Sequence, residues 1–328
     1  MSIKEQTLIL FDDYKELTVK EIVLKTGASK QMVHNVLNGL VNKGAVQKLG
    51  RTPKTSYRLV ENDSMIKDIE PPYLNSKDDN FLNQHFLIVD EMGNLLKGAE
   101  AFAVWCAQRK LPFEKTMHEF AQTITKYKPF YDINGNINGT EKLLNTKGYD
   151  KIWIDNLFYL DFYAIERFGK TPLGTLLHYA KQGQSTYLMK LMMQEIKTRV
   201  LKFIELQNAD AIAFAPPTIR RETQFMKFLQ SNLNISLPVV EIKKVNGLIP
   251  VPQKSIPKIE ERIRNAENTF AVTDPRKFKH VILIDDAVGS GATVNQIAGK
   301  IKLKGIAAEV TGLGIVGSFK GFDVVSDV

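Results

Sequence analysis

The sequence predicts an α/β protein, with a parallel sheet flanked by helices and a small basic module of helices and a hairpin before it. Two observations carry this prediction. The apolar run 281–284 stands directly before two aspartates, a glycine-rich turn and a helical pattern, which is the strand–loop–helix order of α/β sheets. Residues 1–60 show helical periodicity and hold ten Lys/Arg against five Asp/Glu, so they carry five of the eight excess positive charges.

Composition narrows the class of protein. Hydrophobic residues make up 44% of the 328 positions and charged residues 24%, as in ordinary globular chains. No apolar run approaches the ~20 residues that cross a bilayer, and the first residues lack a signal-peptide layout. Cys106 is the single cysteine, which excludes an internal disulfide and a cysteine-based zinc site. We therefore expect a cytoplasmic protein without a membrane partner.

Residues 1–62 are predicted to form the first domain. Thr18 and Glu21 make a capping-box pattern that opens a helix, and Gly27 is a signal for its end. Ser29 can cap the next helix. That second helix is expected to bury an apolar face made of Met32, Val33, Val36, Leu37 and Leu40. Its outer face keeps the polar residues Lys30, Gln31, His34, Asn35 and Asn38.

Two predicted strands follow this helix, and the turn between them carries Arg51 and Lys54. Helix, short glycine turn, helix and basic hairpin together resemble a winged helix-turn-helix domain over residues 3–60. The resemblance implies binding to DNA or structured nucleic acid, with the polar outer face of the second helix in a major groove and the hairpin on phosphates. A module that contacts protein instead is the alternative.

The next two segments carry less information. Residues 63–80 are polar, include a Pro pair, and are predicted to be a linker. Residues 81–170 mix helical patterns with strand and turn patterns but contain no chemical motif. They are predicted to be a mixed α/β region, either inserted or forming a hood over a site. Residues 171–328 are then the main α/β domain.

The aspartate pair predicts a ligand. Asp285 and Asp286 come where the predicted strand ends, and open α/β sheets bind ligands at the carboxyl ends of their strands. The following loop, 287–293, can turn backbone N–H groups and the start of a helix toward a phosphate, with help from the Ser290 and Thr293 hydroxyls. Two carboxylates would repel more phosphate and suit hydroxyls or magnesium. The pattern therefore favours a ribose 5-phosphate.

Three other loops of similar appearance fit less well. The Gly-Lys-Ser/Thr ending of a Walker A loop is missing, and a dinucleotide fingerprint would need a third glycine and no acids before the loop. A response-regulator receiver also carries acids after a strand, but too little chain follows Asp286 to build the rest of it. A purely structural strand–loop–helix would not need adjacent acids.

The order apolar run, Asp-Asp, two residues, Gly/Thr-rich triplet, small residue, Thr resembles the phosphoribosyl-pyrophosphate (PRPP) signature of type I phosphoribosyltransferases. The resemblance implies a type I phosphoribosyltransferase-like parallel sheet flanked by helices. It also implies that Asp285 and Asp286 are catalytic and bind the ribose hydroxyls, with Mg²⁺ held nearby through PRPP. The 5-phosphate would be bound by Ala287, Val288, Gly289, Ser290, Gly291, Ala292 and Thr293. Gly289 replaces a frequent family threonine, which removes one hydroxyl.

Other segments between about 170 and 328 resemble the ComF-type subgroup. Residues 211–215 are predicted to be a strand, and the basic loop after it lies where the family has its pyrophosphate loop. This implies substrate binding by Pro217, Thr218, Arg220 and Arg221. The subgroup's order of Gln, apolar residue, Glu-Arg, Arg-Asn and Phe recurs between 253 and 270, which implies a catalytic Arg262 and substrate-binding Arg264 and Asn265. ComF proteins commonly open with a cysteine zinc module, which this chain cannot form.

Three functions follow from these resemblances. In the first, the chain is a phosphoribosyltransferase, or a related enzyme that acts on a nucleotide or nucleic acid, and its winged helix directs it to the target. In the second, it is a non-catalytic, PRPP-responsive DNA-binding transcriptional regulator, as in the purine repressors of Gram-positive bacteria, which have the same domain order. In the third, it is a nucleotide-targeting effector of a bacterial defence or toxin cassette linked to a reverse transcriptase. The intact acid pair and the segment with Arg262 and Arg264 favour the enzyme, whereas the fused winged helix favours regulation. A homo-oligomer is compatible with each function.

Overall fold

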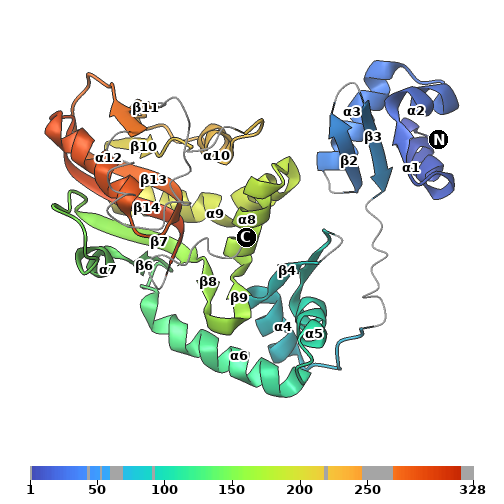
Figure 1. Ribbon diagram of the computed structural model, residues 1–328, viewed down its shortest axis with the longest axis horizontal. Helices are drawn as coiled ribbons and strands as arrows, with labels where there is room; N and C mark the ends of the chain where they lie inside the picture. Colours follow the sequence, from blue (N-terminus) through green and yellow to red (C-terminus); the bar gives the residue numbers. More distant parts are fainter. Residues whose placement is uncertain are drawn as a thin grey trace. The chain divides into compact units, whose positions relative to one another are not determined.

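The computed structural model describes residues 2–42, 45–51, 54–59, 69–90, 93–217, 221–245 and 269–318 (Figure 1). The chain divides into two compact units. The first consists of Met1–Tyr73 with Val89–Leu96, and the second of Leu74–Ile88 with Lys97–Val328.

The first unit combines helices with a small antiparallel sheet, whose strand order is β1–β3–β2. Its helices and strands are α1 (Ile3–Asp13), β1 (Leu17–Thr18), α2 (Val19–Thr26), α3 (Lys30–Asn42), β2 (Val46–Arg51) and β3 (Lys54–Leu59). The predicted order of helix, short turn, helix and hairpin is therefore present, with α1 in front of it.

Local capping explains where the helices of this unit begin and end. The Glu21 amide donates to the Thr18 hydroxyl, and the Glu21 carboxylate accepts from the Thr18 amide at 2.7 Å. That backbone bond lowers the pKa of Glu21. Helix α2 ends at Gly27, which has a φ of 67° that glycine adopts without strain. The Met32 amide donates to the Ser29 hydroxyl at 3.2 Å, so the predicted caps are confirmed.

The core of the first unit is formed by Phe11, Leu17, Ile22, Val33, Leu37, Leu40, Val46 and Tyr57. Val36 packs against it from a partly buried position. The expectation that Met32 is buried was wrong, because 49% of it is exposed. On α3 the buried stripe starts at Val33 and continues through Leu37 and Leu40, and Met32 lies one residue off that stripe.

Helices make up much of the second unit. Its α-helices are α4 (Ser76–His85), α5 (Gly98–Gln108), α6 (Phe113–Tyr127), α7 (Thr140–Leu144), α8 (Pro172–Gln182), α9 (Thr186–Leu206), α10 (Phe225–Leu233) and α12 (Ala292–Leu303). Short 3-10 helices are η1 (Lys128–Phe130) and η2 (Glu166–Phe168). Helix α12 packs against β13 and β14, and α8 packs against β7 and α9.

The main sheet has the strand order β10–β13–β14–β7–β6. Its strands are β6 (Ile137–Asn138), β7 (Asn156–Phe162), β10 (Ala211–Phe214), β13 (Phe278–Val288) and β14 (Ala307–Gly317). Strands β10, β13, β14 and β7 are parallel, and β6 is antiparallel to β7. The carboxyl ends of the four parallel strands therefore lie at one edge, and the predicted α/β class with a parallel sheet is confirmed.

Three short two-stranded ladders are separate from this sheet. They are β4 (Leu87–Val89) with β5 (Leu95–Lys97), β8 (Ala164–Ile165) with β9 (Gly169–Lys170), and β11 (Ile242–Lys244) with β12 (Phe270–Val272). The last of these follows β10 and precedes β13 in the chain. It therefore lies between two strands of the main sheet in sequence.

Two domain boundaries differ from those predicted. Helix α4 begins at Ser76, inside the predicted linker 63–80, because the Asn75 side chain accepts hydrogen bonds from the amides of the first helical turn. Strand β7 lies within 81–170 yet belongs to the main sheet, so that sheet does not start at 171 as predicted. Its parallel partner β14 follows about 150 residues later, and such a distant pairing leaves no local pattern in the sequence.

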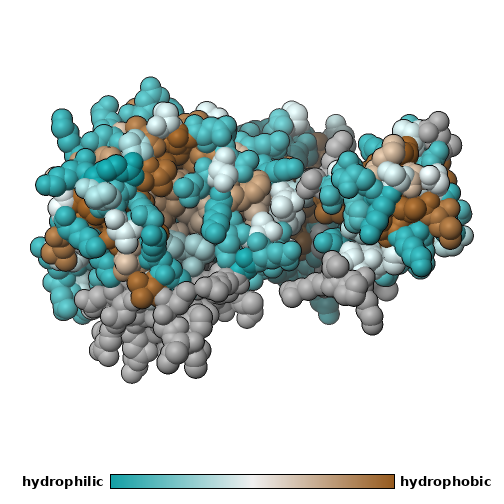
Figure 2. All heavy atoms as spheres, turned by 90° about the horizontal axis from the view of Figure 1, so that it is seen from above, coloured by the Kyte–Doolittle hydropathy of each residue, from teal (hydrophilic) through white to brown (hydrophobic). Residues whose placement is uncertain are grey.

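The interior of the main sheet is apolar. The four residues of 281–284 are fully buried, as predicted for a central strand. The β14–β7 interface is close: a Cβ on Gly317 would lie 2.2 Å from the Tyr159 ring, so only glycine fits there. Figure 2 shows a mostly hydrophilic face with hydrophobic side chains in separate patches. Within the described part of the chain, no helix is long and apolar enough to span a membrane.

Candidate functional site

The aspartate pair lies in β13 at the carboxyl edge of the main sheet. Asp285 is partly exposed and its carboxylate accepts from the Asp286 amide at 2.8 Å. Asp286 is buried, and its carboxylate accepts from the Lys181 ammonium of α8 at 2.6 Å. The two carboxylates therefore have different hydrogen-bond partners.

Strand β13 is longer than the sequence predicts. Ala287 and Val288 were expected in the phosphate loop, but they are buried strand residues in register with Val316 and Gly317 of β14. The pairing with β14 extends the strand past the acid pair. The turn is therefore limited to Gly289, Ser290 and Gly291, and α12 starts at Ala292.

The turn brings the start of α12 directly behind the acid pair. Gly291 is the N-cap residue with a φ of 86°, and a Cβ there would lie 2.6 Å from Leu143. The Ala292 amide donates to the Ser290 hydroxyl at 3.4 Å, and the Ser290 carbonyl accepts from the Tyr149 hydroxyl at 2.9 Å. Thr293 is half-buried in the first turn of α12. The predicted phosphate-loop residues from 289 to 293 thus form one compact turn.

Helix α12 is fixed against the segment before β7 by Asn295, which is fully buried. The Asn295 side chain accepts from the Trp153 amide at 2.6 Å and from the Ile154 amide, and it donates to the Lys151 carbonyl at 2.9 Å. These bonds hold the start of the helix in place. No sequence pattern pointed to this asparagine, because its partners lie more than 140 residues away.

The corner between α8 and α9 forms another wall of the site. Next to Lys181, the Gln182 side chain accepts from the Arg221 guanidinium at 3.3 Å, and the Gln184 side chain accepts from the Thr223 amide at 3.0 Å. Arg221 was predicted to bind pyrophosphate, and it lies on the loop that follows β10. The structure therefore brings this loop and the acid pair to the same corner.

The remaining predicted substrate residues divide into two groups. Pro217 is half-buried at the end of the segment after β10. Thr218, Arg220, Arg262, Arg264 and Asn265 lie outside the described residues. Lys181 was not predicted, because a lysine near the end of a helix is common and its contact spans 105 residues of chain.

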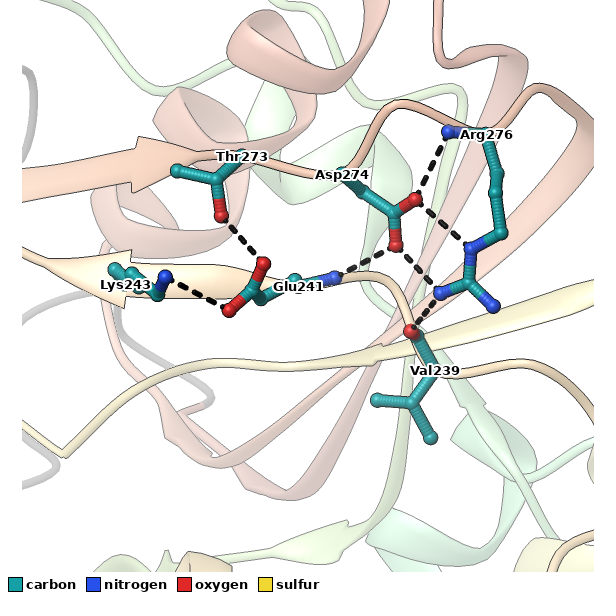
Figure 3. Close-up of polar contacts among 6 residues, drawn as sticks. All are labelled: Val239, Glu241, Lys243, Thr273, Asp274 and Arg276. Atoms are coloured by element: carbon teal, nitrogen blue, oxygen red, sulfur yellow. Dashed lines mark hydrogen bonds and ion pairs between the residues drawn. The ribbon is translucent and has the colours of Figure 1, made fainter.

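In the sequence, the predicted segment around Arg262 lies between β11 and β12. A cluster of polar contacts joins the chain just before β11 to the chain just after β12 (Figure 3). The Asp274 carboxylate accepts from the Arg276 amide and guanidinium and from the Glu241 amide. Arg276 also donates to the Val239 carbonyl at 2.6 Å. The Arg276 guanidinium holds the pKa of Asp274 well below its usual range.

A half-buried polar pair, Asp161 and Tyr131, lies at the end of β7. Asp161 is in register with Val316 and, through it, with Ala287, so it lies at the same edge of the sheet. Its carboxylate accepts from the Tyr131 hydroxyl, while Arg199 donates to the Leu160 and Gly135 carbonyls. Burial raises the pKa of both Asp161 and Tyr131. These bonds tie the loop before β6 to the sheet.

The acids alone do not form a metal centre. The described residues contain no group of three or more His, Cys, Asp or Glu side chains placed to hold a metal ion. Of the two carboxylates of the acid pair, that of Asp286 is already bonded to Lys181. A magnesium ion would fit here only as part of a complex with ligand oxygens.

In the first unit, the α3 residues predicted to contact nucleic acid are at least partly accessible. Lys30, Gln31, Asn35 and Asn38 are exposed on α3, and His34 is half-buried. Gln31 donates to the Asn35 side chain at 3.5 Å. Arg51 and Lys54 face each other in the β2–β3 ladder, although their side chains lie outside the described part of the structure.

Comparison with known proteins gives no family assignment. No family model matches the chain, and no curated protein is significantly similar to it. The chemistry of the site is therefore inferred from its own residues.

Proposed function

We propose that the second unit binds PRPP and is a ComF-like, type I phosphoribosyltransferase domain. One observation carries the proposal: an acid pair near the carboxyl end of a buried parallel strand is followed, after two further strand residues, by a tight glycine turn and a helix start. In this assignment the ribose hydroxyls bind at Asp285 and Asp286, and the 5-phosphate binds in the turn from Gly289 to Thr293.

The physical chemistry of the two parts is complementary. The start of α12 offers backbone N–H groups and the positive end of the helix dipole, which favour a phosphate. The carboxylates are acceptors and suit the hydroxyl groups of a ribose. Gly291 permits the turn, since any side chain there would meet Leu143. A ribose with a 5-phosphate presents hydroxyl groups and a phosphate in one ligand.

We propose an enzyme rather than a binding protein. In phosphoribosyl transfer, pyrophosphate leaves the anomeric carbon while an acceptor attacks it, so positive charge develops on the ribose. Carboxylates beside that ring stabilise this charge, and Arg221 with Arg262 would neutralise the leaving group. Magnesium, when bound with PRPP, would supply further neutralisation of pyrophosphate.

A PRPP-responsive DNA-binding regulator is the second candidate. The exposed polar face of α3 in the first unit favours this function, because four exposed polar side chains there could contact bases in a DNA major groove. In that function the same ligand would bind without turnover and would change DNA affinity.

Pyrophosphate release from PRPP and Mg²⁺ tests the enzyme, with and without candidate base acceptors. We expect release by the wild type and at least about 100-fold less by Asp285→Asn and Asp286→Asn. Asp150→Asn is the matched control, because Asp150 is exposed and outside the site. Saturable PRPP binding without release, together with altered DNA affinity, would support the regulator. A wild type that binds no PRPP would overturn both functions.

Fluorescence anisotropy with a labelled DNA duplex tests the first unit. We expect Lys30→Ala to weaken binding and to reduce the slope of log affinity against log salt by about one. Asn35→Ala should weaken binding with little change in that slope. Lys77→Ala, an exposed lysine of α4, is the control. Equal affinity of all four proteins would argue against a nucleic-acid interface on α3.

A further inference from the structure

The ion pair between Lys181 and Asp286 lies where a ligand can reach it. The two charged atoms are 2.6 Å apart, and the side chains are 20% and 12% exposed. The pair is thus shielded enough to be strong, yet it opens to solvent at the carboxyl edge of the sheet.

Helix α8 places Lys181 on the side of the loop that follows β10. Its neighbours Gln182 and Gln184 contact Arg221 and Thr223 of that loop. One turn earlier, His178 contacts the Tyr163 hydroxyl at 3.0 Å, beyond the end of β7. Along α8 the contacts therefore pass from the end of β7, through Asp286 of β13, to the loop after β10.

The glycine turn is contacted by other elements. Tyr149 bonds to the Ser290 carbonyl, and Leu143 of α7 packs beside Gly291. The turn and Lys181 therefore lie in different surroundings, with the acid pair between them. A ligand whose ribose lies on the acids would direct its 5-phosphate to the turn and its other anionic group toward Lys181 and Arg221.

We propose that Lys181 is a binding residue for the pyrophosphate of PRPP, and that it distinguishes PRPP from ribose phosphates without pyrophosphate. This inference rests on the proposed function. An ammonium has three donors, so Lys181 can bond to pyrophosphate oxygens while Asp286 accepts from a ribose hydroxyl. Before the ligand binds, the same ammonium is the counter-ion of Asp286 and keeps that carboxylate charged and oriented.

A purely structural ion pair between α8 and β13 would act differently. Its removal would disturb Asp286 and would weaken every ligand that uses this carboxylate to the same degree. A pyrophosphate-binding lysine should matter more for PRPP than for ribose 5-phosphate. The two roles are therefore separated by comparing these ligands.

Isothermal titration calorimetry of the full chain with PRPP and Mg²⁺, and with ribose 5-phosphate and Mg²⁺, tests the proposal. The first variant is Lys181→Met, which removes the ammonium group but keeps an apolar side chain of similar length. If this variant does not fold, Lys181→Gln is used for the same comparison. Lys190→Met, an exposed lysine of α9, is the matched control. Lys181→Arg tests rescue by charge.

We expect Lys181→Met to lose about 10- to 100-fold in PRPP affinity, as for one charge-assisted hydrogen bond, with a clearly smaller loss for ribose 5-phosphate. Lys181→Arg should recover most of the loss. Equal loss for both ligands, or no loss for PRPP, would overturn the role of Lys181 while leaving the proposed function intact. A wild type that binds neither ligand would overturn the proposed function and this inference together.

Discussion

Replacing Asp274 by asparagine should destabilise the second unit in a way that depends on pH. The Asp274 side chain is 2% exposed and accepts from four donors, three of Arg276 and the Glu241 amide, at 2.6 to 3.0 Å. Asparagine has the same shape but carries no charge, and its NH₂ group would face these donors. Breaking a buried ion pair of this kind lowers the free energy of unfolding by about 2–4 kcal/mol. This value lies in the lower part of the usual range because the Arg276 side chain is half exposed.

The expected effect on melting is a fall in Tm of about 4–16 °C for a unit of this size. The sign of the pH dependence follows from the lowered pKa of Asp274. Above about pH 4 the carboxylate is charged in the folded and the unfolded chain, so its full contribution is present. Below that pH the unfolded chain binds the proton first, and the contribution falls by up to about 1.4 kcal/mol per pH unit.

Urea unfolding at pH 7, 5 and 3 measures this difference. The two tryptophans, Trp105 and Trp153, both belong to the second unit, so their fluorescence reports on it alone. We expect the gap between wild type and Asp274→Asn to be about 1 kcal/mol smaller at pH 3 than at pH 7, while Asp150→Asn shows no gap. A gap below about 1 kcal/mol at pH 7, or one that does not change with pH, would refute the reasoning.

Three other changes test separate features. Asn295→Ala should lower the free energy of unfolding by about 2–4 kcal/mol, because it removes a fully buried side chain that satisfies the Trp153 amide, and the same urea titration measures this. Gly291→Ala should weaken PRPP binding at least about 10-fold in calorimetry, since its φ is 86° and its Cβ would meet Leu143 at 2.6 Å. Burial raises the pKa of Cys106 to about 11, so iodoacetamide labelling at pH 8 should be about 100-fold slower in the folded protein than in urea.

Features with a local cause could be predicted from the sequence. The Thr18–Glu21 capping box and the Gly27 helix end involve residues at most a few positions apart, and both are present. The buried run 281–284 was also recognised, because a strand covered on both faces is continuously apolar. Met32 was wrongly predicted to be buried, because the face of the helix that is buried depends on which elements pack against it.

Features with a distant cause could not be predicted. The length of β13 depends on its pairing with β14. Because of this pairing, Ala287 and Val288 are strand residues and not part of the expected loop. The contacts of Lys181 and Asn295 each span more than 100 residues, and neither residue stands out in its own segment. The site was therefore found through its motif, while the groups that orient it needed the fold.

The position of β14 has a consequence for how the protein is made. Among the described strands β14 comes latest in the chain, yet it lies between β13 and β7 and is the only strand that connects them. Until residues 307–317 leave the ribosome, β6 and β7 with their helices cannot join β10 and β13. Until then the nascent chain exposes two unpaired sheet edges, so a chaperone that covers them should increase the yield of folded protein, whereas a delay in translation at that stage should lower it.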